Sequence, residues 1–298
     1  MLLGVFVNGD EALAPVAVVI PTHNRSAKLI RALESVAAQT VRPCEVVVVD
    51  DGSDEDIACA LANFQGLDVT YLRNERALGA CAARNRGWRA THSPFIAFLD
   101  SDDVWRADKL AQQLPVLEQD EGAVLVTALF SDLGDDKPII PTSADCLTGD
   151  RLLTRNWVGT CSAPLVRRSA LEAIDGFDET LPSCQDWDLW VRMADRGAAL
   201  LVDQVLVEVD AEGPRLSTHN KGSLTGHRLF AAKHAARIAA LAPEPRSALH
   251  LYLSRLFFQR RALEDSLRHL GLAIRARPTA LFLALGFLIE RLWKKLFG

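Results

Sequence analysis

Four short runs rich in apolar residues are the feature that most constrains how this chain folds. They cover residues 16–20, 46–49, 69–72 and 95–99. Short apolar runs of this kind are typical of strands buried in a parallel sheet. The segments between them, such as 26–40 and 79–90, place apolar residues at helical spacing. This alternation predicts an α/β fold with helices on both faces of a mostly parallel sheet.

Polar loops follow three of these runs, at the points where the strands end. The loops are Pro21-Thr22-His23-Asn24-Arg25, Asp50 to Asp54 and Asp100 to Asp103. In open α/β sheets, ligands bind outside the carboxyl ends of the strands. We therefore expect the three loops to form one binding site.

The remainder of the chain divides into a mixed segment and a helical one. Strand-like sequences occur at 124–130 and 200–209, on either side of a helix that begins near Asp186. We expect them to extend the sheet. Beyond Leu224 the sequence is rich in Ala, Leu and Arg, which predicts helices to the end, divided by the prolines at 243–245.

Composition excludes several classes of protein. The 298 residues are 49% hydrophobic, which is enough for a large core, and the formal net charge of -5 argues against a general nucleic-acid binder. Six cysteines occur without a CxxC pair, so no zinc ribbon or redox motif is visible and a reducing compartment is expected. The first residues lack the basic start and cleavage site of a signal peptide, and we expect a cytoplasmic protein.

The acidic loop Asp100-Ser101-Asp102-Asp103 is a candidate cation site. Like charges after a buried strand are costly unless a cation or hydrogen-bond donors compensate them. Oxygen ligands favour Mg²⁺ or Mn²⁺, which keep waters and bridge to substrate phosphates. Alternatively, the carboxylates cap a following helix, for which Asp103 is the best candidate.

Two further acidic positions also allow two interpretations each. Asp50-Asp51-Gly52-Ser53 is typical of a turn, but beside a second acidic strand end the Asp51 carboxylate is also a candidate hydrogen-bond acceptor for a ligand. Ser183 and Asp186 have the spacing of a capping box. Alternatively, Asp186 is a general base held over the binding site. The tryptophans that follow, at 187 and 190, either pack in the core or form a wall for a sugar.

Together these motifs resemble the family 2 glycosyltransferases of the GT-A fold over residues 16–220. The resemblance rests on five sequences in order, which are VVIPTHNR at 18–25, VVVVDDGSDED at 46–56, GACAARNRGW at 79–88, FLDSDD at 98–103, and GFDE followed by QDWDLWVR. It implies a Rossmann-like, mostly parallel central sheet flanked by helices, with a helical C-terminal extension. Residues 1–222 are the expected catalytic domain, and 223–298 the helical region. Within the catalytic domain, the expected nucleotide-sugar half is 16–105 and the acceptor half 106–222.

The resemblance also implies roles for individual residues. Asp186 falls on the family's general base and Asp102 on its metal ligand. Because histidine is a frequent ligand, His219 is a further candidate contact to the metal or to a phosphate, with a plain loop histidine as the alternative. Gln185 and Trp187 would lie on the acceptor side. The expected nucleotide-sugar-binding residues are Pro21, Thr22, Asn24, Arg25, Asp51, Ser53, Arg84, Asp100 and Ser101.

Several residues keep alternative interpretations. Gln185 replaces the Glu that often precedes the base in the family, which changes the local charge but keeps the base. Arg84 is either a cationic contact to the donor or a solvated helical arginine. In the helical tail, His234 and His269 are expected at the surface, and residues 247–278 faintly resemble a tetratricopeptide-like helix pair.

The function that the resemblance implies is sugar transfer from a nucleotide-diphosphate donor, most commonly a UDP-sugar, to an acceptor hydroxyl, with inversion and with Mn²⁺ or Mg²⁺ as cofactor. A glycan or lipid-linked acceptor in surface polysaccharide or glycolipid synthesis is expected, with no nucleic acid as partner. One alternative is a non-catalytic nucleotide-sugar-binding scaffold on the same fold. Another is a nucleotidyltransferase, although PTHNRSAKL at 21–29 lacks the glycines of a phosphate-binding loop.

The segment 278–298 contains an apolar run at 280–289, far shorter than the about 20 residues needed to span a bilayer. Arg275 and Arg277 precede the run, and Trp-Lys-Lys at 293–295 follows it. We expect the segment either to lie in the membrane interface, as a peripheral contact at the inner face of the membrane, or to dock on the core.

Overall fold

The computed structural model describes residues 6–8, 11–140, 142–210 and 220–286, which form two compact units. The first unit draws on residues 1–148, 157–180 and 185–213, and the second on 149–156, 181–184 and 214–298. The sequence analysis places one boundary between 222 and 223. The structure instead starts the second unit earlier and adds two short segments to it.

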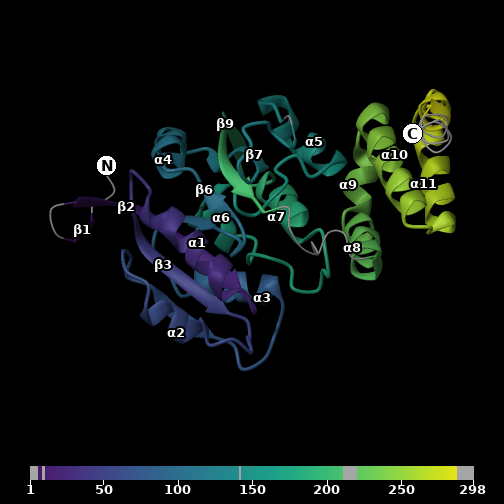
Figure 1. Ribbon diagram of the computed structural model, residues 1–298. Coiled ribbons are helices and arrows are strands. Elements are labelled where there is room, and N and C mark those ends of the chain that lie inside the picture. Colours follow the sequence, from purple (N-terminus) through teal and green to yellow (C-terminus); the bar gives the residue numbers. More distant parts are fainter. Residues whose placement is uncertain (1–5, 9–10, 141, 211–219, 287–298) are drawn as a thin grey trace. The chain divides into compact units, whose positions relative to one another are not determined.

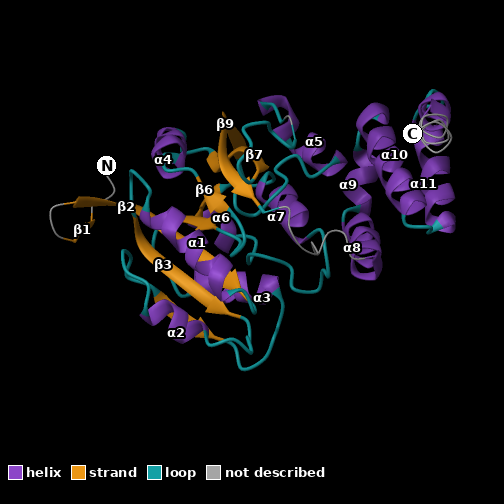
Figure 2. Ribbon diagram, viewed as in Figure 1, coloured by secondary structure: helices purple, strands orange, loops and turns teal. Residues whose placement is uncertain are grey.

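A parallel half-sheet forms the start of the first unit (Figures 1 and 2). Its strands lie in the order β4, β3, β2, β5, and each neighbouring pair is parallel. They are β4 Thr70–Arg73, β3 Pro43–Asp50, β2 Glu11–Thr22 and β5 Phe95–Phe98. Each of the four predicted apolar runs contributes one strand, so the prediction for this half is confirmed.

The other half of the sheet is mixed. β8 Leu165–Arg167 is antiparallel to both its neighbours, β5 and β7 Ala123–Asp132. β7 pairs in parallel with β9 Ala198–Val209, and β6 Val104–Trp105 is antiparallel to β9. β1 Phe6–Asn8 also pairs antiparallel with β2. The fold is therefore α/β as expected, with an antiparallel strand joining two parallel groups.

Helices cover both faces of β3, and the alternation of its side chains shows why. Val46 and Val48 belong to the main core together with the buried face of α1 Ser26–Ala37. Val47 and Val49 instead pack with Ala83 of α3 Ala80–Arg89. Because successive residues of a strand point to opposite faces, four consecutive valines need a helix on each side.

α3 approaches the sheet most closely at Gly87. A Cβ at this position would lie 2.3 Å from Cγ1 of Val19 and 3.1 Å from Cγ2 of Val49. Only glycine permits this separation between helix and sheet. The other helices of the first unit are α2 Ile57–Ala62, α4 Lys109–Gln119, α6 Arg168–Glu172 and α7 Gln185–Met193, with a 3-10 turn at Ala144–Leu147.

The second unit is helical. It contains α5 Gly149–Thr154, α8 Asn220–Lys233, α9 Ala235–Ala240, α10 Pro243–Gln259 and α11 Leu263–Ala276, followed by a short helix from Ala280. α10 starts at Pro243, where the fixed φ of proline suits the first helical turn. α10 packs along α11, so the predicted helix pair is present. Within the described ranges, no helix is both long and apolar enough to cross a bilayer.

The described histidines of the second unit are buried, which corrects the surface position expected for His234 and His269. Their side chains are 5% and 7% exposed. The Nδ1 atoms of His269 and His250 lie 3.1 Å apart, and Phe257 stacks on the His269 ring. Burial, aided by the charge of nearby Arg268, lowers the pKa of both His250 and His269 to about 4. Both rings are therefore neutral at pH 7 and suit a packed helix interface.

Candidate active site

The carboxyl ends of β2, β3 and β5 bring the three predicted loops to one edge of the sheet. Thr22 pairs in register with Asp50, and the Asp51 amide donates to the Thr22 carbonyl at 2.8 Å. On the other side of β2, the Leu99 amide donates to the Val19 carbonyl at 3.0 Å. The loops that follow these strands therefore lie side by side, as the strand order predicts.

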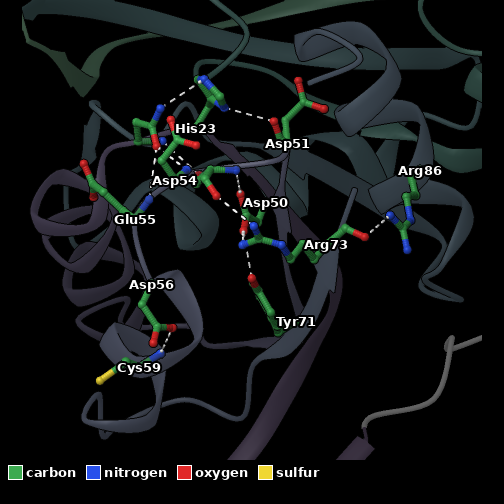
Figure 3. Close-up of polar contacts among 12 residues, drawn as sticks. His23, Asp50, Asp51, Asp54, Glu55, Asp56, Cys59, Tyr71, Arg73 and Arg86 are labelled. Atoms are coloured by element: carbon green, nitrogen blue, oxygen red, sulfur yellow. Dashed lines mark hydrogen bonds and ion pairs between the residues drawn. The ribbon is translucent and has the colours of Figure 1, made fainter. Parts of the chain in front are cut away.

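Asp51 is buried and accepts three hydrogen bonds from the segment that leads into α3. Its Oδ1 accepts from Nδ2 of Asn74 at 2.7 Å and from the Leu78 amide at 2.9 Å. Its Oδ2 accepts from the Gly79 amide at 2.7 Å. The His23 ring contacts the Asp51 carbonyl through Nδ1 at 2.9 Å (Figure 3). The carboxylate therefore fixes the loop beside it, and Oδ2 retains capacity for a further donor.

Asp50, which the sequence analysis did not single out, is fully buried in an ion pair (Figure 3). Its Oδ2 accepts from Nη1 of Arg73 at 2.7 Å and from the Tyr71 hydroxyl at 2.8 Å, and its Oδ1 accepts from the Ser53 amide at 2.8 Å. Burial acts to raise the pKa of Asp50, but the hydrogen bonds from Ser53 and Tyr71 and the charge of Arg73 outweigh it and lower the pKa. Asp50 therefore stays ionised and anchors the strand end.

Asn24 connects the first loop to the second. Its amide donates to Oγ of Ser53 at 2.9 Å, and its side-chain oxygen accepts from the Asp54 amide at 2.7 Å. Asn24 itself has a positive φ of 52°, and Gly52 has φ of 72°. A Cβ on Gly52 would lie 2.6 Å from the Arg76 carbonyl carbon, so this turn requires glycine. Asn24 and Ser53 are thus brought together as expected, through contacts with each other.

A buried hydroxyl at the end of β2 lacks a partner. Pro21, Thr22 and Ser101 are all buried. Among the described side chains, Oγ1 of Thr22 is one of the few buried polar atoms that make no hydrogen bond. Because buried polar groups are normally satisfied, such an atom at the end of a strand is consistent with a ligand partner.

Arg84 is buried in α3 and pairs with the acidic loop, so it is not the solvated helical arginine considered above. Its side chain is 8% exposed, and its Nη2 lies 2.5 Å from Oδ1 of Asp100. The guanidinium also lies over the Phe177 ring, 5.4 Å from the centroid. Burial acts to lower the pKa of Arg84, but the Asp100 charge outweighs it and raises the pKa. Arg84 therefore neutralises the first carboxylate of the acidic loop.

Asp102 is the carboxylate of this loop whose partner is exposed, since Asp100, itself 29% exposed, pairs with the buried Arg84. The Asp102 side chain is 24% exposed and forms an ion pair with Nη1 of Arg25, which is itself 41% exposed. The backbone is held separately, because Nη2 of Arg31 donates to the Asp102 carbonyl at 2.9 Å and to Oδ2 of Asp210 at 2.7 Å. Lys28 also pairs with Asp210 at 3.0 Å. The position of the loop is therefore fixed independently of the Asp102 side chain.

Asp103 points into the protein and does not cap a helix. The two residues after it form β6, which makes the capping interpretation of Asp103 wrong. The Ser162 hydroxyl donates to its Oδ2 at 2.5 Å and accepts from the Asp100 amide at 3.0 Å. Burial, followed by the charge of Asp100, raises the pKa of Asp103 well above its usual range. Asp103 therefore braces the loop, whereas Asp102 faces outward.

Asp186 lies in the first turn of α7, half-buried, with Oδ1 accepting from the Trp187 amide at 2.8 Å. Its charge acts on two buried thiols, Cys81 at the start of α3 and Cys161 before β8. Burial is the main cause of the raised pKa of both thiols, to about 12 for Cys81. Arg84 acts on the same two thiols, so Asp186 and the Arg84–Asp100 pair border one region of the first unit.

The other residues expected on the acceptor side are placed as follows. Gln185 is half-buried, whereas Trp187 is 2% exposed and Trp190 is fully buried. For both tryptophans the structure favours the packing interpretation. His219 lies outside the described residues.

The residues present fit a cation that is bound together with a diphosphate. Over the described ranges, no group of three or more His, Cys, Asp or Glu side chains is arranged to hold a metal ion. Mg²⁺ and Mn²⁺ are commonly bound by only one or two carboxylates, with waters and substrate phosphates completing the shell. Asp102 offers one such carboxylate, because Asp100 and Asp103 are already engaged.

Sequence reasoning missed the residues that support the expected site. Arg73 contacts Asp50, and Asn74 contacts Asp51. Ser162 contacts Asp103. Arg31 contacts the Asp102 carbonyl and is itself held by Asp210. None belongs to the motifs quoted above. Only tertiary structure brings them to the strand ends.

Polar loops at the carboxyl ends of parallel strands, with helices on both faces of the sheet, define a doubly wound type of α/β fold. The sequence profile described as Glycosyl transferase family 2 matches residues 17–174, more than half of the chain. The chain therefore belongs to glycosyltransferase family 2.

Curated relatives are moderately similar. The amylovoran biosynthesis glycosyltransferase AmsB of Erwinia amylovora is 28% identical over 229 residues, covering 72% of this chain and 75% of AmsB. An uncharacterised glycosyltransferase of Haemophilus influenzae is 28% identical over 193 residues, covering 59% of this chain and 61% of the relative. The chain thus spans less than two thirds of that relative, and a third of one from Rickettsia conorii.

Solved structures share the fold. S. aureus TarS 1–349 superposes with a TM-score of 0.66 at 20% identity, covering 90% of this chain and 82% of TarS. The mannosyltransferase PcManGT from Pyrobaculum calidifontis was solved with GDP-Man and Mn²⁺. It superposes with a TM-score of 0.63 at 20% identity, covering 96% of this chain and 86% of PcManGT. The GT-A fold expected from the sequence is thereby confirmed.

Proposed function

We propose that this protein is an inverting glycosyltransferase that moves a sugar from a nucleotide-diphosphate donor to an acceptor hydroxyl. One observation carries the proposal. At the carboxyl edge of the sheet, Asp102 pairs with the exposed Arg25, whereas Asp100 pairs with the buried Arg84 and Asp103 is buried against Ser162. A carboxylate kept accessible in this way suits a transient partner.

The proposed donor is a UDP-sugar. Asp51 would accept from the base through Oδ2, and the unpartnered Oγ1 of Thr22 would take a polar group of the nucleotide. The rest of the proposed donor pocket is Pro21, Asn24, Arg25, Ser53, Arg84, Asp100 and Ser101. Structures of the fold relative TarS were solved with UDP-GlcNAc and with UDP, and PcManGT was solved with GDP-Man, so the screen below offers both nucleotides.

The proposed cofactor is Mn²⁺ or Mg²⁺, held by Asp102 and by the donor phosphates, with His219 as a further candidate. When bound, such a cation neutralises the charge that develops on the departing diphosphate. Two arginine side chains of the protein would add positive charge near the departing diphosphate. Arg25 lies beside Asp102, and Arg84 would hold Asp100 oriented toward the ribose or sugar.

Asp186 is the proposed general base. Its carboxylate would take the proton of the acceptor hydroxyl as that oxygen forms a bond to the anomeric carbon, and the bond from this carbon to the diphosphate would break. A single displacement inverts the anomeric configuration without a covalent intermediate. Gln185 is placed beside the base on the proposed acceptor side, and Trp187 supports α7 from the core.

The proposed acceptor is a glycan or a lipid-linked sugar in surface polysaccharide synthesis. The relative named UDP-Glc:alpha-D-GlcNAc-diphosphoundecaprenol beta-1,3-glucosyltransferase WfgD, from Escherichia coli, is 35% identical over 102 residues, covering 34% of this chain and 40% of WfgD. The acceptor in the name of WfgD is lipid-linked, and AmsB is named for a polysaccharide. A lipid-linked acceptor would place the reaction at the inner face of a membrane.

A donor-binding and hydrolysis screen tests this function. UDP-, GDP- and dTDP-sugars are offered with Mn²⁺ or Mg²⁺ to the wild type, Asp102→Ala and Asp186→Asn. We expect one donor to bind and hydrolyse slowly, Asp102→Ala to lose metal-dependent binding, and Asp186→Asn to bind normally but turn over about 10²–10⁴-fold more slowly. Donor binding without any turnover by the wild type, over a range of acceptors, would favour the non-catalytic scaffold instead.

A further inference from the structure

The two parts of this chain carry opposite charge, which the overall value of -5 conceals. Residues 214–298, most of the second unit, contain 15 Lys and Arg against four Asp and Glu, a formal charge of +11. Residues 1–213 contain 18 basic against 34 acidic residues, a formal charge of -16. A domain-sized separation of this kind points to an anionic partner for the basic part.

The short helix after α11 presents its large apolar side chains to solvent. Ala280 is fully buried against Leu251 and Ala273, and Ala284, four residues later, packs on the same cluster. Phe282 is 73% exposed, and Leu281, Leu283 and Leu285 are each more than 40% exposed. The small residues therefore anchor this helix, and the large ones remain available for another surface.

The outer face of α11 combines apolar and basic side chains. Leu263 and Leu267, one turn apart, are 57% and 68% exposed. Arg268 and Arg275, two turns apart, are exposed on the same helix. Together with the four exposed residues 281, 282, 283 and 285, these four side chains are termed the apolar-basic face.

The described acidic side chains of residues 220–286 offset little of the positive charge of the second unit. Asp265 pairs with Arg228, with 2.5 Å between Oδ2 and Nη2, and Glu244 pairs with Arg277 at 3.1 Å. Of the three acidic side chains among the described residues of 220–286, two are thus already neutralised within the unit. The basic excess at the apolar-basic face remains available to an external anion.

We propose that the second unit binds an anionic phospholipid surface through the apolar-basic face. Exposed leucines and a phenylalanine interleaved with arginines match a bilayer interface, where apolar side chains enter the acyl boundary and guanidinium groups meet the phosphates. A nucleic acid would satisfy the arginines but leave the leucines in water. The acidic first unit is repelled by the same lipid surface, so the charge pattern selects the second unit for the contact.

Vesicle co-sedimentation of the full chain, without donor or metal, tests this proposal. One set of vesicles is phosphatidylcholine alone, and the other is an equal mixture of phosphatidylcholine and phosphatidylglycerol. We expect the protein to bind the mixed vesicles at least about tenfold more tightly, and binding to weaken as salt is raised.

Variants then separate the apolar from the basic contribution. Phe282→Glu with Leu285→Glu, and separately Arg268→Glu with Arg275→Glu, are each expected to reduce binding to the mixed vesicles about tenfold or more. Leu133→Glu, at an apolar side chain of the first unit that is 42% exposed, is the matched control and is expected to bind like the wild type. Unchanged circular dichroism shows that the variants are folded.

Three results would overturn the proposal. They are equal binding to the two vesicle types, no binding to either, and normal binding by both double variants. If Phe282→Glu with Leu285→Glu instead converts a dimer to a monomer without affecting vesicle binding, the face contacts a second copy of the chain. Because the assay contains no sugar nucleotide, its outcome is independent of the proposed transferase function.

Discussion

The two acidic strand ends, at β3 and at β5, have similar sequences but opposite organisation. At β3, the carboxylates of Asp50 and Asp51 accept hydrogen bonds from fixed protein donors. At β5, Asp103 is buried against Ser162 and Asp100 pairs with the buried Arg84, whereas Asp102, 24% exposed, pairs with Arg25, which is 41% exposed. Burial of the carboxylate thus distinguishes Asp50, which holds the fold, from Asp102, which solvent and a ligand can reach.

The largest expected effect is at the open strand end. Asp102→Asn should lower kcat/KM by about 10²–10³-fold, because it removes charge where the diphosphate departs, while the melting temperature stays within a degree or so of the wild type. Steady-state kinetics and thermal unfolding measure the two effects. Asp68→Asn, at an exposed carboxylate just before β4, is the control and should change neither. A large loss of stability in Asp102→Asn would mean that Asp102, like Asp50, holds the fold, and the proposed difference between the two strand ends would be wrong.

The closed strand end should show the converse. Asp50→Asn should lower the free energy of unfolding by about 2 kcal/mol, because Arg73 and Tyr71 lose a charged acceptor inside the protein. This figure is below that of a fully buried pair, since Arg73 is 48% exposed and its charge is screened by solvent. Urea unfolding gives the difference. A variant as stable as the wild type would mean that Asp50 is not an anchor.

The pH dependence of stability should follow the same carboxylate. The pKa of folded Asp50 is lowered, so the unfolded chain binds protons more readily and stability rises with pH. The contribution of Asp50 is fully present above its unfolded pKa of about 3.9 and is lost as the pH falls through the folded value. Urea unfolding between neutral and acidic pH should show a steeper acid loss in the wild type than in Asp50→Asn. Parallel curves would contradict this.

The smallest expected effect concerns the cation that already sits beside Asp102. Arg25→Gln should strengthen the binding of Mn²⁺ alone about two- to fivefold, because an exposed ion pair contributes less than about 1 kcal/mol. Titration calorimetry without donor measures it. Arg76→Gln removes one exposed positive charge from a neighbouring loop and is the control. If both variants strengthen Mn²⁺ binding equally, the effect comes from the lower net positive charge of the protein and not from breaking the Arg25–Asp102 ion pair.

The sequence predicted the strands and loops of the parallel half-sheet well. Apolar runs of four or five residues, each bounded by a polar turn, are local signals, and the parallel order of β4, β3, β2 and β5 followed from their alternation with helices. The antiparallel insertion of β8 and the two-residue β6 carry no such periodicity. Both depend on pairing with strands far away in the chain.

Side-chain environments were harder to predict than elements. Arg84 and His269 lie in helices whose sequences permit exposure, yet packing against Phe177 and Phe257 buries them. Likewise, Ser162 contacts Asp103 across 59 positions of sequence, and Arg31 contacts Asp210 across 179. A sequence motif identifies a residue whose side chain suits a given chemistry. Contacts with residues far away in the sequence decide whether that side chain is buried, paired or accessible to a ligand.

The glycine in the third turn of α3 sets how close a charged group can come to the carboxyl edge of the sheet. Arg84 lies one turn before Gly87 on the same helix, and the hydrogen at position 87 is the spacer between helix and sheet. Adding a single methyl group there would lift the helix and draw the guanidinium away from Asp100. The electrostatics of the acidic loop therefore depend on the size of an uncharged residue that touches neither the donor pocket nor any carboxylate.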